Sequence, residues 1–349
     1  MHLESKIALA TGAGAGMVAG TTQVSRALSI VADAGLGHGE LTEVPVTEIG
    51  SGELLLRASY SSVNYKDALA ATGRGKVVRR FPLIGGIDVV GEVVESADPA
   101  YQPGDLVIVT GFGLSEEHDG GYAQWVRVPS AWVVRLPEGL NPWESMALGT
   151  AGLTAALAIQ RLEANGLRPG QGAVAVTGAT GGVAGLAIGM LAGLGYEPVA
   201  LTRQRDADVY LRSIGAASVE QVPTVCASPK PLGSARWAGA VDSVGGQTLA
   251  WLIRTMQRGG SIAAFGNAGG HELPTSVLPF ILRAVNLLGI NTGYFDDALR
   301  QRLWARMATD LRPEHLDRMT STIGFDELPQ AFDGLLNGSV RGRLVVNLG

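Results

Sequence analysis

The sequence predicts an α/β protein in which a β-rich, barrel-like domain precedes a doubly wound parallel sheet. Two observations support this prediction. Short apolar segments separated by turn residues occupy residues 26–140, which is typical of a β-rich barrel. From there to about residue 288, apolar strands alternate with helical segments, and this alternation is typical of a parallel α/β sheet.

Composition excludes several classes of protein. The chain has 349 residues, of which 46% are hydrophobic and 17% are charged, so it can form two packed domains. A net charge of -5 gives no electrostatic basis for binding nucleic acid or an anionic membrane. The most apolar region, residues 183–201, is interrupted by glycines and Pro198, so no membrane span is expected.

Cysteine usage restricts the chain further. Cys226 is the only cysteine, so the chain can form no intrachain disulfide and no cysteine-rich zinc site. A reducing, cytoplasmic location is therefore expected. Residues 6–16 imitate a strand that runs into a glycine-rich loop, but no second strand completes the unit. We expect residues 1–24 to be a poorly ordered extension without a function of its own.

The expected elements follow in chain order. In the first half, strands are expected at residues 27–32, 53–59, 89–95 and 106–110. Asn141 and Pro142 are typical of a helix start, and an apolar helix is expected at residues 155–162. Beyond the nucleotide-binding region, the expected elements are strands 239–242 and 261–265, helix 299–311 and a final strand at 341–347.

The second half is organised around a glycine-rich turn at residues 173–185. An apolar strand, residues 173–176, is followed by closely spaced glycines and then by a segment with helical character. This order is typical of dinucleotide-binding sites, where glycines let the backbone approach a pyrophosphate at a helix N-terminus. The alternative is an ordinary tight strand–helix turn. The residues predicted to contact the cofactor here are Thr180, Gly181, Gly182 and Val183.

The end of the next strand, residues 198–201, indicates which dinucleotide is bound. An NAD site usually has an acidic residue there for the ribose 2′-hydroxyl, whereas an NADP site has cations or hydroxyls for the 2′-phosphate. This chain has Thr202, Arg203, Gln204 and Arg205 and no carboxylate among them. The sequence therefore predicts NADPH, with the arginines on the phosphate. The alternative is that both arginines are solvated loop residues.

Five further stretches identify a family. They are residues 62–69 (SVNYKDAL), 82–88 (PLIGGID), 118–122 (HDGGY), 148–154 (LGTAGLT) and 278–283 (LPFILR). Over residues 26–347 the chain resembles the zinc-independent group of acrylyl-CoA reductases and quinone oxidoreductases within the medium-chain dehydrogenase/reductase superfamily. The resemblance implies a GroES-like catalytic domain (residues 25–150 and 312–349), a Rossmann NADPH-binding domain (residues 151–311) and a homodimer.

The resemblance also implies that no metal takes part. The places that hold zinc ligands in zinc-containing relatives are occupied here by the Asn64 region, Ile87 with Asp88, and the Thr150 region. None of these offers a thiolate or an imidazole, the ligands that zinc prefers. Without a Lewis acid, a simple ketone or alcohol is hard to polarise, and an activated alkene is the easier substrate.

The resemblance assigns roles to individual residues. Tyr65 is the expected proton donor beside the nicotinamide, and Asn64 is expected to orient the ribose or the substrate carbonyl. A satisfied core tyrosine is the alternative for Tyr65. Lys66 and Asp67 are expected to form an ion pair or to be surface charges. The remaining assignments are Gly266, Asn267 and Arg343 to the cofactor cleft and Phe280 to the substrate.

A basic loop at residues 74–80 completes the expected site. It holds four cations, and its Arg79 and Arg80 are predicted to bind the phosphates of coenzyme A. A solvated loop is the alternative. The predicted activity is NADPH-dependent reduction of a short 2-enoyl-CoA such as acrylyl-CoA, with hydride added to the β-carbon and a proton to the α-carbon. The alternatives are an NADPH:quinone oxidoreductase and a non-catalytic NADPH-binding sensor or structural protein.

Overall fold

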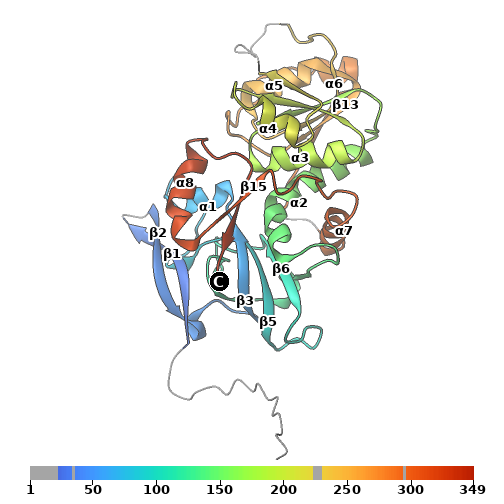
Figure 1. Ribbon diagram of the computed structural model, residues 1–349. Coiled ribbons are helices and arrows are strands. Elements are labelled where there is room, and N and C mark those ends of the chain that lie inside the picture. Colours follow the sequence, from blue (N-terminus) through green and yellow to red (C-terminus); the bar gives the residue numbers. More distant parts are fainter. Residues whose placement is uncertain (1–22, 34–35, 223–229, 294–295) are drawn as a thin grey trace, which may run out of the picture.

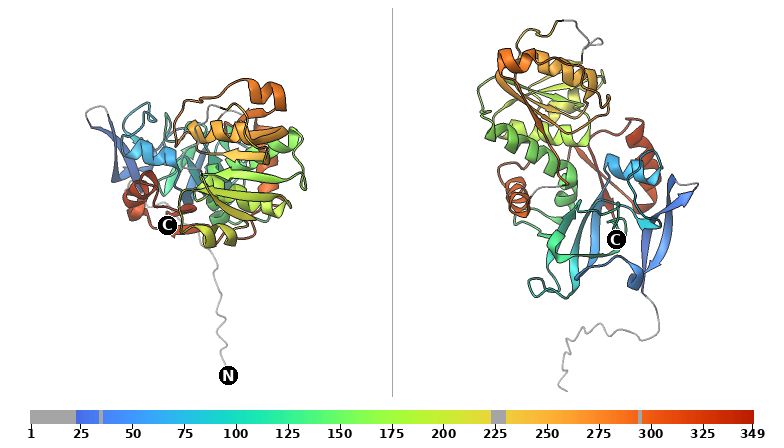
Figure 2. Two further views of the ribbon diagram at one scale, coloured as in Figure 1. Left: turned by 90° about the horizontal axis from the view of Figure 1, so that it is seen from above. Right: turned by 180° about the vertical axis from the view of Figure 1, so that it is seen from behind.

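The structure of the protein is a computed structural model that describes residues 23–33, 36–222, 230–293 and 296–349 (Figure 1). Two bodies lie end to end, one rich in antiparallel strands and one built on a parallel sheet, and the view from behind shows the same arrangement (Figure 2). The predicted extension lies outside the described residues up to residue 22, as does Cys226.

The first body contains two sheets, which are antiparallel except for the parallel pair β15–β16. One has the order β2-β1-β4, from β1 (Val24–Asp33), β2 (Leu36–Pro45) and β4 (Leu83–Ile84). The other has the order β15-β16-β3-β5-β6-β8, with β7 also paired to β3. Its strands are β3 (Leu54–Ser62), β5 (Asp88–Ser96), β6 (Leu106–Thr110), β7 (Trp125–Val128), β8 (Val134–Arg135), β15 (Thr320–Ile323) and β16 (Arg343–Asn347).

Alternation of apolar side chains along these strands explains the core of the first body. Leu28, Leu54, Val89 and Val107 are fully buried and belong to one hydrophobic cluster. Short helices close its ends. They are α1 (Tyr65–Ala71), α8 (Leu328–Leu336) and the 3₁₀ turns η1 (Val46–Glu48), η2 (Ser130–Trp132) and η3 (Phe325–Glu327).

The second body is a six-stranded parallel sheet in the order β11-β10-β9-β12-β13-β14, which is the order of the doubly wound dinucleotide fold. The strands are β9 (Ala173–Thr177), β10 (Glu197–Thr202), β11 (Ser218–Gln221), β12 (Trp237–Asp242), β13 (Met256–Ala264) and β14 (Asn286–Gly289). Its helices are α3 (Gly182–Gly193), α4 (Asp208–Ser213), α5 (Gly246–Thr255) and α6 (Leu278–Arg283). The predicted fold class is confirmed.

The long helix α2 (Pro142–Ala164) joins the two bodies, since it contacts β3 and β5 on one side and α3 on the other. It begins as predicted. The backbone amide of Glu144 donates to the Asn141 side chain at 2.9 Å, and the Glu144 carboxylate accepts from the Asn141 amide at 3.0 Å. Helix α7 (Asp297–Met307) packs on α2 and ends before the predicted residue 311. No helix in the described part of the chain is long and apolar enough to cross a bilayer.

The C-terminal segment returns from the second body to the first. Before entering β16, the amide of Gly342 donates to the carbonyl of Thr180 in the glycine-rich turn at 2.9 Å. Gly342 has φ +69°, and a Cβ there would lie 2.2 Å from the Met319 carbonyl oxygen, so only glycine fits. We call residues 338–343 the strap. It fixes the last barrel strand against the nucleotide-binding turn.

Candidate functional site

The glycine-rich turn has the geometry of a pyrophosphate site. Gly178 follows β9 with φ +61°, and the amide of Gly181 donates to its carbonyl at 2.8 Å. Gly181 caps α3 without a side-chain hydrogen bond, so the first amides of the helix remain available to an anion. Ala184 lies in the hydrophobic core with 1% exposure, so its methyl group does not crowd the turn. The predicted residues Thr180, Gly181, Gly182 and Val183 lie together at this turn.

The loop after β10 presents the predicted arginines to solvent. The hydroxyl of Thr202 accepts from the Gln204 amide at 3.0 Å and stabilises the turn. Arg203 and Arg205 are exposed, and neither side chain pairs with another residue in the described part of the chain. Arg341 of the strap reaches the same loop, because its Nε donates to the Gln204 Oε1 at 3.0 Å. Arg341 was not among the predicted site residues.

A second pair of loops lies along the same carboxyl edge of the sheet. The Asp242 carboxylate accepts from the Gly245 amide at 2.9 Å and from the Thr177 hydroxyl at 2.7 Å, which joins the ends of β12 and β9. Burial raises the pKa of Asp242, while these hydrogen bonds lower it. Gly266 packs against the Ser243 backbone. Asn267 beside it is exposed, so both predicted residues lie at the carboxyl edge of the sheet, and their contact with a cofactor stays a prediction.

A buried polar network lies at the junction of the two bodies. The carboxylate of Asp88 accepts from the Ser62 hydroxyl at 2.7 Å, from the Asn64 amide nitrogen at 2.8 Å and from the Thr150 backbone amide at 3.0 Å. The Thr150 hydroxyl also donates to this carboxylate. A Cβ on Gly149 would lie 2.6 Å from the Asp88 Oδ2, so the helix α2 leaves helical geometry there to admit the carboxylate.

Arg343 neutralises this network. Its guanidinium donates to Ala147 O and Val63 O, both at 3.0 Å, to Ser62 Oγ at 2.9 Å and to Asn64 Oδ1 at 3.2 Å. The residue is 4% exposed; burial lowers the pKa of Arg343, and the charge of Asp88 opposes that shift. The guanidinium is thus occupied by protein groups. Its aliphatic stem lies beneath the start of α3, where a Cβ on Gly182 would be 2.9 Å from Arg343 Cδ. A direct contact to the cofactor stays a prediction.

The donor set of the network does not fit a catalytic zinc ion. Asn64, Asp88 and Thr150, the three places named from the sequence, do come together, but they offer oxygen atoms and an amide around a guanidinium cation. Zinc prefers imidazole and thiolate ligands and would have to displace that cation. No group of three or more His, Cys, Asp or Glu side chains suited to a metal occurs in the described ranges 23–33, 36–222, 230–293 and 296–349.

Tyr65 stands at the first position of α1, directly after the network. Its side chain is 51% exposed, and its hydroxyl has no hydrogen-bond partner among the residues that the structure describes. The satisfied core tyrosine considered as the alternative is therefore wrong. Asn64, which precedes it, is 9% exposed and is held on both sides of its amide by Asp88 and Arg343. The network therefore fixes the start of the helix that carries Tyr65.

Asp67 and Lys66 do not form the expected ion pair. Asp67 is buried, and its carboxylate accepts from the Asn64 amide at 2.9 Å and from the Ile87 amide at 3.0 Å. Burial, together with repulsion from Asp88, raises the pKa of Asp67 to about 7. The ammonium group of Lys66 pairs instead with Glu116. Consecutive helix residues point in different directions, which is why the two charges cannot meet.

The basic loop is partly neutralised. Arg79 lies 3.4 Å from the Glu117 carboxylate, while Arg80 donates to the Glu117 carbonyl at 2.8 Å and lies 3.6 Å from the Asp119 carboxylate. Both arginines remain exposed. The other two cations, Arg74 and Lys76, are exposed and have no ion pair within the described residues. These two are the cations most available to a ligand.

The side chains of His118 and Phe280 both contact other parts of the protein. His118 is buried, with Nε2 2.8 Å from the Ser51 carbonyl oxygen and Nδ1 2.8 Å from the Asp119 carbonyl oxygen, so it holds a loop in place. Phe280 in α6 is half-buried and packs on the hydrophobic cluster around Trp237. Its assignment to the substrate stays a prediction.

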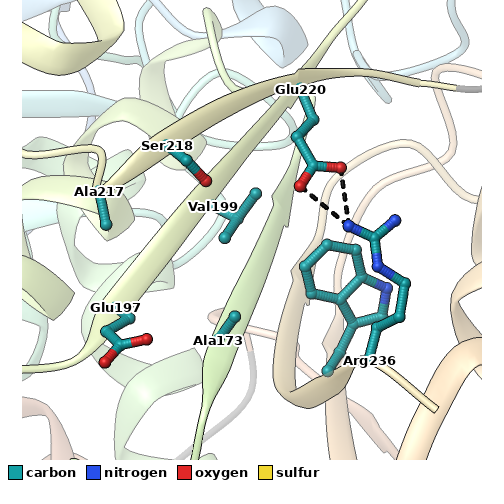
Figure 3. A pocket seen from close by; sticks show the side chains of 8 residues that line it. Ala173, Glu197, Val199, Ala217, Ser218, Glu220 and Arg236 are labelled. Atoms are coloured by element: carbon teal, nitrogen blue, oxygen red, sulfur yellow. Dashed lines mark hydrogen bonds and ion pairs between the residues drawn. The ribbon is translucent and has the colours of Figure 1, made fainter.

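A surface depression of about 480 Å³ lies elsewhere (Figure 3). It is lined by residues that open their strands, among them Ala173, Glu197 and Ser218, so it lies at the amino edge of the sheet. Arg236 there donates to both oxygens of Glu220 at 2.9 Å. Ligands of open α/β sheets bind at the carboxyl edge, so this depression is not the candidate site.

Comparisons with known proteins agree with this geometry. A family model described as "Alcohol dehydrogenase GroES-like domain" matches residues 50–138. The acrylyl-CoA reductase AcuI of Ruegeria pomeroyi is 44% identical over 317 residues, which cover 90% of this chain and 96% of that protein. Bacillus subtilis YhfP, whose name places it among the quinone oxidoreductases, is 46% identical over 297 residues, which cover 84% of this chain and 90% of that protein.

Solved structures give the same result. The Salmonella enterica YhdH oxidoreductase in complex with NADP superposes with a TM-score of 0.90 at 40% identity, covering 93% of this chain and 100% of that one. The Bacillus subtilis YhfP structure with NAD bound has a TM-score of 0.89 at 42% identity, with the same coverage of both chains. The chain therefore belongs to the medium-chain dehydrogenase/reductase superfamily, and within it to the group that contains the acrylyl-CoA reductases and the YhfP and YhdH oxidoreductases.

Proposed function

We propose that this protein is an NADPH-dependent reductase of activated carbon–carbon double bonds and that its substrate is a short 2-enoyl-CoA such as acrylyl-CoA. One observation carries the proposal: Tyr65 presents an exposed phenol without a protein partner, on a helix that the Asp88–Arg343 network fixes beside the nucleotide-binding turn. The acrylyl-CoA reductase name of the Ruegeria relative supports the substrate class.

The residues of this chain fit NADPH. Free amides at the start of α3 would hold the pyrophosphate, and Arg203 with Arg205 would hold the 2′-phosphate. NADPH, when bound, supplies the hydride that adds to the β-carbon. One relative was crystallised with NADP and another with NAD, so the choice of NADPH depends on the absence of a carboxylate at Thr202–Arg205.

The remaining chemistry belongs to the protein. The Tyr65 phenol donates a hydrogen bond to the thioester carbonyl and then a proton to the α-carbon, so the double bond gains one hydride and one proton. Asn64 acts through Tyr65, because both ends of its amide are already engaged inside the protein. Gly266 and Asn267 would approach the nicotinamide, and Phe280 would contact the substrate.

An acceptor screen tests the proposal. Purified protein is assayed with NADPH and with NADH against acrylyl-CoA, crotonyl-CoA and quinones, and cofactor oxidation is followed by absorbance. The proposal expects the highest kcat/KM with NADPH and a 2-enoyl-CoA. Preference for quinones would favour the alternative that the name of the Bacillus relative suggests. Binding of NADPH without turnover of any acceptor would favour a sensor or structural role.

Replacement of the proposed proton donor is the second test. Tyr65→Phe removes the hydroxyl and keeps the ring, so we expect kcat to fall by about tenfold or more with little change in NADPH affinity. Thermal stability should not change, because the hydroxyl has no partner among the described residues. An unchanged kcat would refute the proton-donor role.

Substitutions in the basic loop test whether the substrate is an acyl-CoA or a quinone. Charge reversal at Arg74 and Lys76, the cations without ion pairs in the described chain, should raise KM for acrylyl-CoA and leave KM for a quinone unchanged. Reversal at Arg79 and Arg80 should act in the same direction. It should also release Glu117 and therefore disturb the loop itself. A KM that is insensitive to all four changes would remove the argument for coenzyme A.

We also propose a homodimer, in a reducing compartment such as the cytoplasm. Strand β14 pairs only with β13 among the described strands. Beside this free edge, Val277, Ile281 and Leu287 are 65%, 68% and 37% exposed, which is an apolar surface suited to a second copy. Light scattering of the Ile281→Glu variant tests it, with a monomer expected. The domain boundaries, residues 25–150 with 312–349 and 151–311, are likewise proposed, and sheet membership supports them.

A further inference from the structure

We propose that Arg341 determines cofactor selectivity: it binds the 2′-phosphate of NADPH together with Arg203 and Arg205 and masks the carboxylate of Asp206. This inference rests on the proposed function, because it takes NADPH to be the cofactor. It adds a residue that lies far along the chain from the loop after β10.

The strap holds Arg341 in place at that loop. On one side of it, Gly342 donates to the Thr180 carbonyl in the glycine-rich turn at 2.9 Å. On the other side, the Gln204 side-chain nitrogen lies 3.4 Å from the Gly338 carbonyl oxygen. Both contacts join the strap to segments that bind the cofactor, so the backbone of Arg341 cannot leave the loop without breaking them.

The guanidinium of Arg341 spans the loop. Its Nε donates to the Gln204 Oε1 at 3.0 Å, and its Nη2 donates to the Asp206 Oδ2 at 2.6 Å. The side chain remains 35% exposed, so further N–H donors of the planar group can reach a ligand. A guanidinium binds phosphate through parallel hydrogen bonds, and a 2′-phosphate among three arginines would be well neutralised.

The negative charge of Asp206 is the reason why NADPH binding requires Arg341. A carboxylate directly after Arg205 would repel a 2′-phosphate, and the same group is the kind that binds the ribose 2′-hydroxyl in an NAD site. Arg341 pairs with it, and this hydrogen bond lowers the pKa of Asp206. The Asp206 side chain is 77% exposed, so the pair adds little to stability. Its effect should appear in the choice of cofactor.

Removal of Arg341 should therefore act twice, by deleting a phosphate ligand and by exposing the carboxylate. We expect Arg341→Ala to raise the Kd for NADPH by about tenfold or more, as for a lost charge-assisted hydrogen bond. The Kd for NADH should stay within about twofold or decrease, since Asp206 becomes free to bind the 2′-hydroxyl. Asp206→Asn alone should tighten NADPH, and in the Arg341→Ala background it should restore part of the lost affinity.

The experiment measures both dissociation constants by calorimetry on the full-length protein, without any turnover. Arg236→Ala is the matched control, because it removes an arginine of similar exposure from a carboxylate pair at the opposite edge of the sheet. That control should leave both constants unchanged. Melting temperatures of all variants show whether the strap remains in place.

Two results would overturn the inference while leaving the proposed function intact. One is an equal weakening of NADPH and NADH in Arg341→Ala, which would mean that Arg341 only anchors the strap. The other is that neither dissociation constant changes in Arg341→Ala. A wild-type protein that binds neither nucleotide would overturn the inference and the proposed function together.

Discussion

Two polar regions meet at the junction of the two bodies, and they are built in opposite ways. The nucleotide edge consists of backbone: glycine turns leave the first amides of α3 without side-chain partners. The network beneath Tyr65 consists of side chains, and there Asp88 and Arg343 are buried and engaged by protein groups on several sides. The first region is left open for a ligand, whereas the second is satisfied internally and can only position its neighbours.

This difference distinguishes residues that bind ligands from residues that hold the ligand-binding residues in position. Among the described residues, the Tyr65 hydroxyl and the guanidinium groups of Arg203 and Arg205 have no protein partner, and we assign ligands to them. Arg341 is partly engaged by Gln204 and Asp206 and keeps further donors for a ligand. The network joins β3, β5, α2 and β16, so it sets where α1 begins and hence where Tyr65 lies. Substitutions in the network should thus act on folding first, and substitutions at the edge on cofactor binding first.

The largest effect is expected from Arg343→Met, which keeps an unbranched apolar stem and removes the charged guanidinium. Asp88 would then lose a nearby positive charge, leaving that of Arg300, and the carbonyl groups of Ala147 and Val63 would lose a donor. Arg343 is linked to Asp88 through the shared Ser62 and Asn64 side chains, so the loss of folding free energy should approach the value of about 3–5 kcal/mol for a broken buried charge pair. Urea denaturation compared with wild type measures this loss.

A second substitution tests whether charge is the cause. Asp88→Asn in the Arg343→Met background removes the buried carboxylate, so it should recover part of the lost stability. No recovery would mean that packing of the Arg343 stem under Gly182, rather than charge, explains the effect. A loss below about 1 kcal/mol in the single variant would contradict the network as described.

A smaller effect is expected at the nucleotide edge, from Gly266→Ala. A Cβ there would lie 2.0 Å from the Ser243 carbonyl oxygen, which is backbone and cannot turn aside. Overpacking of this kind costs about 1–3 kcal/mol, and the displaced loop should also weaken NADPH binding. Gly193→Ala at the end of α3 is the control, because nothing lies within 4 Å of its Cβ. That change should be neutral or stabilise by up to about 1 kcal/mol. Equal effects would refute the steric argument.

The sequence was informative where the site is local and uninformative where it is assembled from distant segments. The glycine-rich turn, its strand and its helix are contiguous, so the order of residues in 173–193 already predicts them. The network draws Ser62, Asp88 and Arg343 from three separate strands. Only the family resemblance singled out Asp88 and Arg343, and residue order alone does not indicate that these polar side chains are buried together. Arg341 escaped prediction for the same reason, although the Arg-Gly-Arg pattern before the last strand was a possible signal.

The wrong prediction of an ion pair and the missed short strands also arise because the sequence alone gives no tertiary contacts. The expected pair of Lys66 and Asp67 failed because proximity in the sequence is not proximity on a helix surface. Short edge strands such as β14 and β15 were also missed, since four residues carry too little periodicity to predict. What the sequence lacks in both cases is tertiary context.

The smallest effect, when measured per pH unit, concerns Asp67, which borders the network and carries a titrating carboxyl group. Burial and the charge of Asp88 raise the pKa of Asp67 to about 7 from its ordinary value of 3.8, so the folded protein holds this proton more tightly than the unfolded chain. Between these two values the folded state binds more protons, and stability must fall as pH rises. The contribution of Asp67 is therefore complete below about pH 4 and is lost progressively up to about pH 7.

Asp67→Asn isolates this contribution, because the variant keeps the shape and cannot titrate. Its absolute stability should change, since one of the acceptors for the Asn64 and Ile87 amides becomes a donor. The informative quantity is the difference in slope: wild type should lose on the order of 1 kcal/mol per pH unit relative to the variant between pH 5 and 7. Urea denaturation at several pH values measures both slopes, and titration of all other groups cancels in the comparison. Parallel slopes would contradict this prediction. They would mean that Asp67 is already ionised in the folded protein, with its charge stabilised by the two amides and by the nearby Arg343.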